Sequence, residues 1–113
     1  MKVLLDTSFV LSAIRNKIDF LDRIENLGLQ AIVPTQVIVE LEGIAKTKQE
    51  AEIALKILKK VKVIDLKTKN TDAGIIKYAK NNKIVVATLD KEIKKKTKNQ
   101  KLVIRAKKRL EIL

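Results

Sequence analysis

Short apolar runs alternate with amphipathic stretches along the whole of this 113-residue chain. The amphipathic stretches place apolar residues at helical spacing, as at Ile53, Ala54 and Ile57. In contrast, Lys83–Thr88 (KIVVAT) is dominated by the β-branched residues that favour strands. Strands that are separated by helices pair in parallel through right-handed crossovers. The sequence therefore predicts an α/β fold, a three-layer α/β/α sandwich around a central parallel sheet.

The individual elements are predicted from apolar periodicity and capping residues. Strands are expected at Lys2–Leu5, Ala31–Val33, Val61–Leu66, Lys83–Thr88 and Leu102–Ile104. Helices are expected from Asp6-Thr7-Ser8 to Ile14, at Ile18–Leu27 with Gly28 at its end, after Pro34, at Gln49–Lys60, from Asn70-Thr71-Asp72, and over a short basic stretch from Asp90. The assignment of Arg109–Leu113 stays open. The length suits one domain, residues 1–113.

The absence of Cys and His restricts the chemistry that this chain can perform. Without Cys there are no disulfides, thiolate metal sites or thiol nucleophiles. Without His there is no Ser–His catalysis, and most zinc sites are excluded. Because oxygen-only ligands favour hard cations, any metal cofactor is expected to be Mg²⁺ or Mn²⁺.

The positive charge is concentrated in the second half of the chain. The net charge is +12; residues 1–55 carry 6 basic and 8 acidic side chains, whereas residues 56–113 carry 19 basic and 5 acidic ones. A strongly basic half is typical of a nucleic-acid partner. The alternative is a lysine-rich solvated surface of the kind found in thermophilic proteins. Charge alone does not choose between the two.

No apolar run reaches the ~18 residues that a membrane-spanning helix needs. The N-terminal stretch superficially resembles a signal peptide, but Asp6 interrupts its apolar run and no small-residue cleavage site follows. We therefore expect a cytoplasmic protein with no membrane association.

Four acidic residues follow or lie near predicted strand ends. Asp6 directly follows the first strand and Asp90 the fourth, Asp72 opens the helix after the third strand, and Glu40 lies on the helix after the second. Ligands of such sheets bind outside the carboxyl ends of the strands, and a pair of divalent ions held there could catalyse phosphodiester displacement. The alternative is that the three Asp residues cap helices. Glu40 and Glu42 flank the apolar face almost symmetrically, so periodicity does not separate them.

Four segments of the chain resemble, in order and spacing, the acidic motifs of the PIN domain. They read LLDTSFVL, VIVELEGI, NTDAGIIKYA and VVATLDKEIKKK, and they span almost the whole sequence. The resemblance places the four family acids on Asp6, Glu40, Asp72 and Asp90. It implies a sheet of order 3-2-1-4-5, an Mg²⁺- or Mn²⁺-dependent endoribonuclease and an RNA substrate. Where family members often have Asn two residues after the first acid, this chain has Ser8.

The resemblance also assigns supporting residues. Thr88 takes the place of a family hydroxyl two residues before the last acid, and Thr7 and Ser8 are further candidate hydroxyls; their alternative role is local, at a strand end or helix start. The lysines expected to bind RNA, or else only to solvate the surface, are Lys91, Lys94, Lys95, Lys96 and Lys98. With 3% aromatics, a base-stacking platform is not expected, and Tyr78 is expected in the core.

Several functional alternatives stay open at the level of sequence. The T-x-D motif followed by lysines is similar to the ribosomal-RNA-processing branch of archaea and eukaryotes. The chain could instead be the ribonuclease toxin of a toxin–antitoxin pair, or a catalytically silent RNA-binding scaffold. A homodimer stays open as well. A haloacid-dehalogenase-type phosphatase is excluded, because its second Asp is replaced by Ser8.

Overall fold

The computed structural model describes residues 1–113, and strands and helices alternate through most of it. The strands are β1 (Lys2–Leu5), β2 (Gln30–Pro34), β3 (Lys62–Ile64), β4 (Val85–Ala87), β5 (Lys101–Arg105) and β6 (Arg109–Ile112). The helices are α1 (Thr7–Arg15), α2 (Phe20–Asn26), α3 (Thr35–Ile44), α4 (Gln49–Leu58), α5 (Thr71–Asn81) and α6 (Lys91–Lys96). Every predicted element is present, and most are one to three residues shorter or longer than the sequence pattern indicates.

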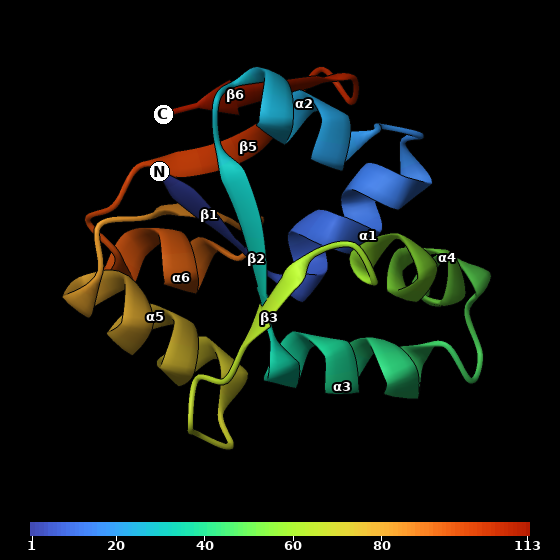
Figure 1. Cartoon of the computed structure of the whole chain (residues 1–113), viewed down its shortest axis with the longest axis horizontal. Coiled ribbons are helices and arrows are strands. Elements are labelled where there is room, and N and C mark those ends of the chain that lie inside the picture. The colour runs from blue at the N-terminus through green and yellow to red at the C-terminus, as the bar shows by residue number, and fades with distance from the viewer.

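The six strands form one sheet in the order β3-β2-β1-β4-β5-β6 (Figure 1). All neighbouring strands are parallel except β5 and β6, which are antiparallel. The predicted fold class and the order of the first five strands are confirmed. The first three strands extend the sheet in one direction from β1, and the last three extend it in the other direction from β4. The strand order therefore reverses between β1 and β4, and in open α/β sheets ligands bind at such a reversal.

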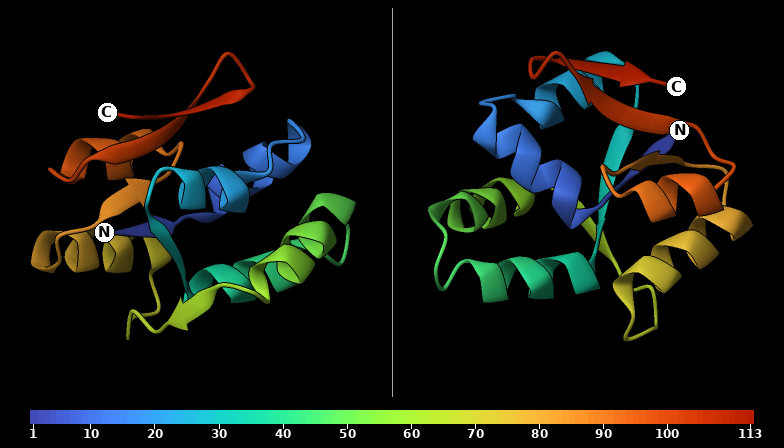
Figure 2. Two further views of the ribbon diagram at one scale, coloured as in Figure 1. Left: turned by 45° about the horizontal axis from the view of Figure 1, so that its top comes forward. Right: turned by 180° about the vertical axis from the view of Figure 1, so that it is seen from behind.

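Alternate residues of each inner strand pack on opposite faces of the sheet. Val3 and Leu5 of β1 join a cluster of 17 buried residues with α1–α4, whereas Leu4 joins a cluster of 7 with α5 and α6. Figure 2 shows the same division, with α5 and α6 together on one side of the sheet and α1, α3 and α4 on the other. Both faces are therefore covered, which explains why the strand sequences are almost wholly apolar.

The last strand is the main element that the sequence left open. β6 pairs with β5 from Leu102↔Ile112 to Arg105↔Arg109, and the turn between them contains no Gly, Asn or Pro. Because tight hairpin turns are normally recognised by such residues, this hairpin has no sequence signal. The third strand is shorter than predicted, since only Lys62–Ile64 of the expected Val61–Leu66 pairs with β2.

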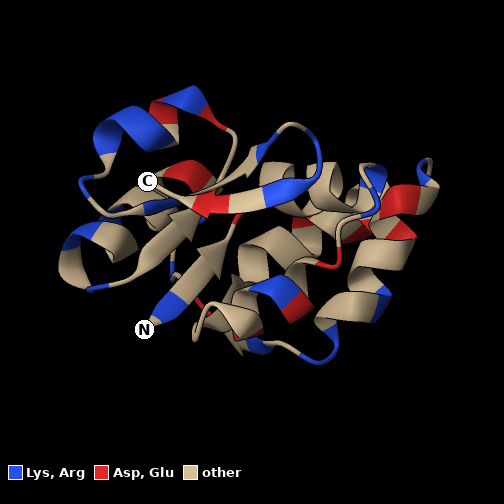
Figure 3. Cartoon of the chain, turned by 90° about the horizontal axis from the view of Figure 1, so that it is seen from above, with Lys and Arg blue, Asp and Glu red and all other residues tan.

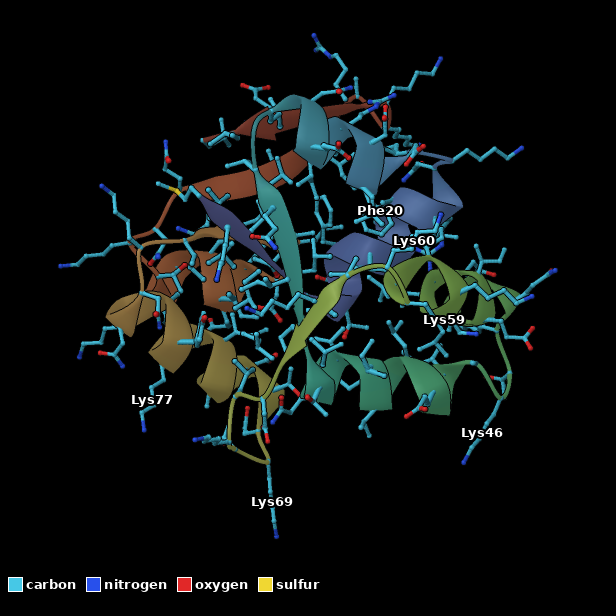
Figure 4. The ribbon with its side chains drawn as sticks, in the orientation of Figure 1. Phe20, Lys46, Lys59, Lys60, Lys69 and Lys77 are labelled. Carbon is cyan, nitrogen blue, oxygen red and sulfur yellow. The ribbon has the colours of Figure 1, made fainter.

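The two Phe side chains lie inside the molecule, and many lysines lie outside (Figure 4). Phe9 and Phe20 are fully buried and meet edge to face with ring centroids 6.3 Å apart. Tyr78 is half-buried and packs against the smaller cluster, so it lies at the margin of the core and not within it. In Figure 4 lysines such as Lys46 and Lys69 point outward from different sides of the molecule. None of the helices has the length and apolar character needed to cross a bilayer.

Candidate functional site

Asp6 and Asp90 both lie at the carboxyl edge of the sheet because β1 and β4 are neighbours. Leu5 is level with Ala87, and the Asp6 amide extends the ladder by donating to the Ala87 carbonyl at 3.0 Å. The chain after β4 leads within three residues to Asp90, which starts α6. Two residues that are 84 positions apart in sequence are thereby placed on adjacent strand ends.

The Asp6 carboxylate is buried and held by two hydroxyl groups. Its side chain is 5% exposed, and its Oδ2 accepts hydrogen bonds from Thr88 Oγ1 at 2.7 Å and from Ser8 Oγ at 3.0 Å. Burial raises the pKa of Asp6, the hydrogen bonds from Thr88 and Ser8 oppose this rise, and the Glu40 charge adds to it. Such a carboxylate is ready to interact with a cation, which would stabilise its ionised form.

The same two hydroxyls connect Asp6 to the chain that carries Asp90. Ser8 Oγ accepts from the Leu89 amide at 3.1 Å, and Thr88 Oγ1 accepts from the Asp90 amide at 3.0 Å. The two hydroxyl oxygens lie 3.5 Å apart. Ser8 and Thr88 therefore bridge two strand ends, so a purely local role is wrong for both of them.

The three Asp residues differ in their relation to the helix ends. Asp90 does cap α6, because its Oδ1 accepts from the amides of Glu92 at 2.8 Å and Ile93 at 3.2 Å. Asp6 precedes α1 but makes no side-chain cap bond. Asp72 lies in the first turn of α5, where Asn70 is the cap. The capping alternative thus accounts for one of the three.

Glu40 turns toward Asp6, and Glu42 does not. Thr7 Oγ1 donates to Glu40 Oε1 at 2.6 Å, which links α3 to the first residue of α1. The Glu40 charge is also among the causes that raise the pKa of Asp6. Glu42 is exposed and makes no hydrogen bond or ion pair. The structure thereby separates two residues that periodicity leaves equivalent.

Asp72 completes the set from the other face of the sheet. Asp72 is an exposed residue at the start of α5. The pKa of its carboxyl group is raised, mainly by partial loss of hydration and to a smaller extent by the charges of Asp90 and Asp6. Glu40 therefore lies near enough to act on Asp6, and Asp90 and Asp6 lie near enough to act on Asp72. An excess of like charge of this kind favours bound cations.

The donor set suits a hard divalent cation, although the side chains as they stand do not enclose one. All candidate ligands are oxygen atoms, and Asp6 Oδ1 and Asp90 Oδ2 accept no hydrogen bond from a side chain. No group of three or more acidic side chains lies close enough together to hold one ion directly. The residues therefore fit the chemistry of Mg²⁺ or Mn²⁺ in charge and donor type.

Two further residues position α5 and its acid, and no pattern in the sequence selects them. Gln36 of α3 donates to Asp65 Oδ1 and to the Thr68 carbonyl, both at 3.0 Å, and accepts from the Leu66 amide at 3.3 Å. Gly74 of α5 packs directly on the same loop, since an added Cβ would overlap Thr68 Cγ2. The loop before Asp72 is thus held between α3 and α5.

The predicted RNA-binding lysines lie on and just beyond α6, which starts at Asp90 (Figure 3). Lys91, Lys95 and Lys98 are exposed and make no ion pair, whereas Lys94 is half-buried and Lys96 pairs with Glu92 at 3.3 Å. These side chains are free to contact a polyanion near the acids.

A large groove of the molecule lies away from the acids. It has a volume of ≈ 1050 Å³, and its lining includes the first residues of β2 and β3 and the side chains of Phe20, Ile57 and Lys60. The amino ends of the strands thus border it, whereas Asp6 and Asp90 lie at the carboxyl ends. The acidic site is an open edge of the sheet and not part of this groove.

The chain is similar to known proteins over almost its whole length. It is 31% identical over 125 residues to Ribonuclease VapC4 of Methanocaldococcus jannaschii, covering 98% of this chain and 95% of that protein. The solved PIN domain endonuclease Utp24 is 26% identical, with a TM-score of 0.81 over 99% of this chain and 92% of that one.

Two other solved structures share the fold at lower identity. VapBC2 from Rickettsia felis, bound to a DNA fragment from its promoter, has a TM-score of 0.60 at 16% identity, over 89% of this chain and 98% of that one. A domain of a functionally unknown protein from Methanocaldococcus jannaschii has a TM-score of 0.63 at 23% identity, over 93% and 91%. The family model described as a PIN-like domain matches residues 3–109. Together with the 31% relative, this match shows that the chain belongs to the PIN-like domain family.

Proposed function

We propose that residues 1–113 form one nuclease domain that hydrolyses RNA phosphodiester bonds internally, with Mg²⁺ or Mn²⁺ as cofactor. The observation that carries the proposal is the buried Asp6 carboxylate, tied by Thr88 and Ser8 to the strand end that leads to Asp90. Three other acids lie around it, and the chain is similar to a ribonuclease and to an endonuclease over almost its full length.

Each residue of the site has a proposed role. Asp6 and Asp90 would hold the main metal ion, and Glu40 and Asp72 would hold a second ion or orient the attacking water. Bound divalent ions would supply Lewis-acid activation and stabilise the charge on the attacking and leaving oxygens. Water attacks the phosphorus and the 3′-oxygen leaves. Thr7 restrains Glu40 through its 2.6 Å hydrogen bond.

The supporting hydroxyls and lysines are assigned to positioning. Ser8 and Thr88 fix the orientation of Asp6, so that one carboxylate oxygen stays available to the metal. The lysines at 91, 94, 95, 96 and 98 would hold the RNA backbone through phosphate contacts, which position a strand without reading its sequence.

Cleavage of a labelled RNA with and without added Mn²⁺ tests the proposal. We expect Asp6→Asn and Asp90→Asn each to reduce the rate by more than the ~10–100-fold that is typical of residues outside the metal ligands, because a ligand charge is lost. Asn preserves shape and still caps a helix, so the circular dichroism spectrum should not change. EDTA should stop the wild-type reaction.

A matched pair of variants on α3 gives the control. Glu40→Gln should reduce cleavage, whereas Glu42→Gln should not, since only Glu40 contacts the site. Wild-type activity that persists in EDTA would contradict the metal-dependent mechanism. RNA binding without cleavage in any divalent metal would instead favour the silent scaffold.

The biological substrate has two candidates with different support. The T-x-D motif with its lysines supports ribosomal RNA processing, and the similarity to the endonuclease Utp24 supports internal cleavage. The 31% identity to a VapC ribonuclease supports the toxin of a toxin–antitoxin pair. Two experiments separate these candidates. Induced expression of a toxin in a bacterial host arrests growth, and Asp6→Asn abolishes the arrest. Deletion of a processing enzyme from its own cells makes ribosomal RNA precursors accumulate. A homodimer and a cytoplasmic location remain part of the proposal.

A further inference from the structure

The turn between β5 and β6 is the most densely basic segment outside α6. Four of the five residues Arg105–Arg109, here called the basic hairpin tip, are Lys or Arg, and all five are exposed. Among the four cations, only Arg105 has a carboxylate partner, Glu111 at 3.5 Å. Lys107, Lys108 and Arg109 therefore carry charge that nothing within the protein neutralises.

The basic hairpin tip lies beyond the carboxyl end of β5 and over α2 (Figure 1). Leu5 is level with Ala87, and Ala87 is level with Leu102, so Arg105 extends two residues further along its strand than Asp6 does. Arg109 borders a small hollow together with residues at the end of α2. The tip is therefore a surface separate from the acidic site, on the side of the molecule that α2 covers.

The tip is held in a defined conformation. Ala106 and Lys107 have φ values of 52° and 60°, and the Lys108 amide donates to the Arg105 carbonyl at 3.1 Å, as in a tight hairpin turn. The guanidinium of Arg23 on α2 donates to the Lys108 carbonyl. A tip restrained from both strands and from α2 loses little conformational entropy when it binds a ligand.

We propose that the basic hairpin tip is a second RNA-contact surface, which holds the backbone of the substrate strand beyond the acidic site. It lies apart from α6, which follows Asp90, and Figure 3 shows the two basic segments at separate places on the molecule. Its contacts are with phosphates, because the tip has no aromatic residue for stacking. The proposal rests on the proposed function for the identity of the substrate, but not on cleavage itself.

The test is equilibrium binding of an RNA of about 16 nucleotides, a length within the usual range of single-strand sites. Titrations are made in EDTA at several salt concentrations, so that no cleavage is needed. We expect a Lys107→Gln, Lys108→Gln, Arg109→Gln variant to bind more weakly and to lower the log–log salt slope by about 2 units, at ~0.7 for each phosphate bound. The control, Lys46→Gln, Lys48→Gln, Lys59→Gln, removes the same charge elsewhere and should keep the wild-type slope.

A second measurement keeps the result independent of the variants. Lysine-selective acylation of the wild-type protein should be slowed at Lys107 and Lys108 by bound RNA, and unchanged at Lys46. An unchanged salt slope together with unprotected lysines at the tip would overturn the proposal. If the slope falls and protection is seen but Mn²⁺ produces no cleavage, the contact surface stands and only the proposed nuclease activity fails.

Discussion

At the scale of single residues, Asp6 shows that the site is built at the expense of stability. The residue is 5% exposed, and the two hydrogen bonds that its carboxylate accepts from hydroxyls do not offset the loss of hydration, since the pKa of Asp6 is raised. A group whose pKa is higher in the folded than in the unfolded chain favours folding only while it is protonated. Ionised Asp6 therefore destabilises the folded protein whenever no cation is bound.

We predict that Asp6→Asn raises the thermal midpoint in EDTA at neutral pH. The amide oxygen can still accept from Thr88 and Ser8, and the uncompensated charge is gone. As the pH falls through the raised pKa of Asp6 toward the ordinary value of 3.8, the advantage should disappear, because the wild-type group also becomes neutral. Differential scanning calorimetry over this pH range measures the difference in thermal midpoint between the variant and the wild type, and Glu42→Gln serves as an exposed control. A lower midpoint for Asp6→Asn at neutral pH would contradict the argument.

At the scale of elements, the position of α5 depends on one close approach. Gly74 is buried against the loop that Gln36 holds, and its amide donates to the Asn70 carbonyl at 2.9 Å. A methyl group at this position would press on Thr68 and Leu66. Since α5 carries Asp72, a shift of this helix reaches the acidic site.

We predict that Gly74→Ala destabilises the protein by ~1 kcal/mol. Overpacking costs about 1–3 kcal/mol, and the better helix propensity of Ala returns about 1 kcal/mol. Gly43→Ala is the matched control: it lies in α3 with nothing within 4 Å of the added Cβ, so it should stabilise. Urea unfolding measures both changes. Adding Thr68→Ser, which removes the nearest methyl group, should recover part of the loss in Gly74→Ala; no recovery would place the strain elsewhere.

At the scale of the whole molecule, the cations form two groups: lysines spread over the surface, and cations gathered on α6 and on the basic hairpin tip. Lysines such as Lys46, Lys69 and Lys77 project from several sides of the protein, which is the expected behaviour of a solvated surface (Figure 4). The cations of α6 instead follow Asp90 directly, and those of the basic hairpin tip are gathered in one turn over α2. Only the cations of α6 and of the basic hairpin tip are expected to hold RNA.

We predict that Lys91→Gln, Lys95→Gln, Lys98→Gln weakens RNA binding equally for unrelated sequences. All three lysines are exposed and make no ion pair, so the fold should be unaffected. The log–log salt slope should fall by ~0.7 for each phosphate that the variant no longer binds, and the cleavage rate at saturating RNA should survive because the acids are untouched. Fluorescence anisotropy at several salt concentrations decides it. A wild-type slope would mean that α6 only solvates the surface.

The sequence by itself determined the elements and limited the chemistry that the chain can perform. Periodicity and β-branched runs locate every strand from β1 to β5, because both faces of a covered parallel sheet require apolar residues. The lack of His and Cys leaves only oxygen ligands, and the acids that follow the strands predict a site at one edge of the sheet. These properties are local or compositional, so a linear pattern is sufficient to show them.

Only the tertiary structure decided which side chains meet. Thr88 reaches Asp6 across 82 residues, and Glu40 rather than Glu42 faces Thr7, because helix rotation and strand adjacency are set by packing. The roles of Gln36 and Gly74, and the pairing of β6 with β5, depend likewise on contacts between distant segments. A hydrogen bond or a close approach between residues far apart in sequence leaves no period in the chain, and the folded geometry alone creates it.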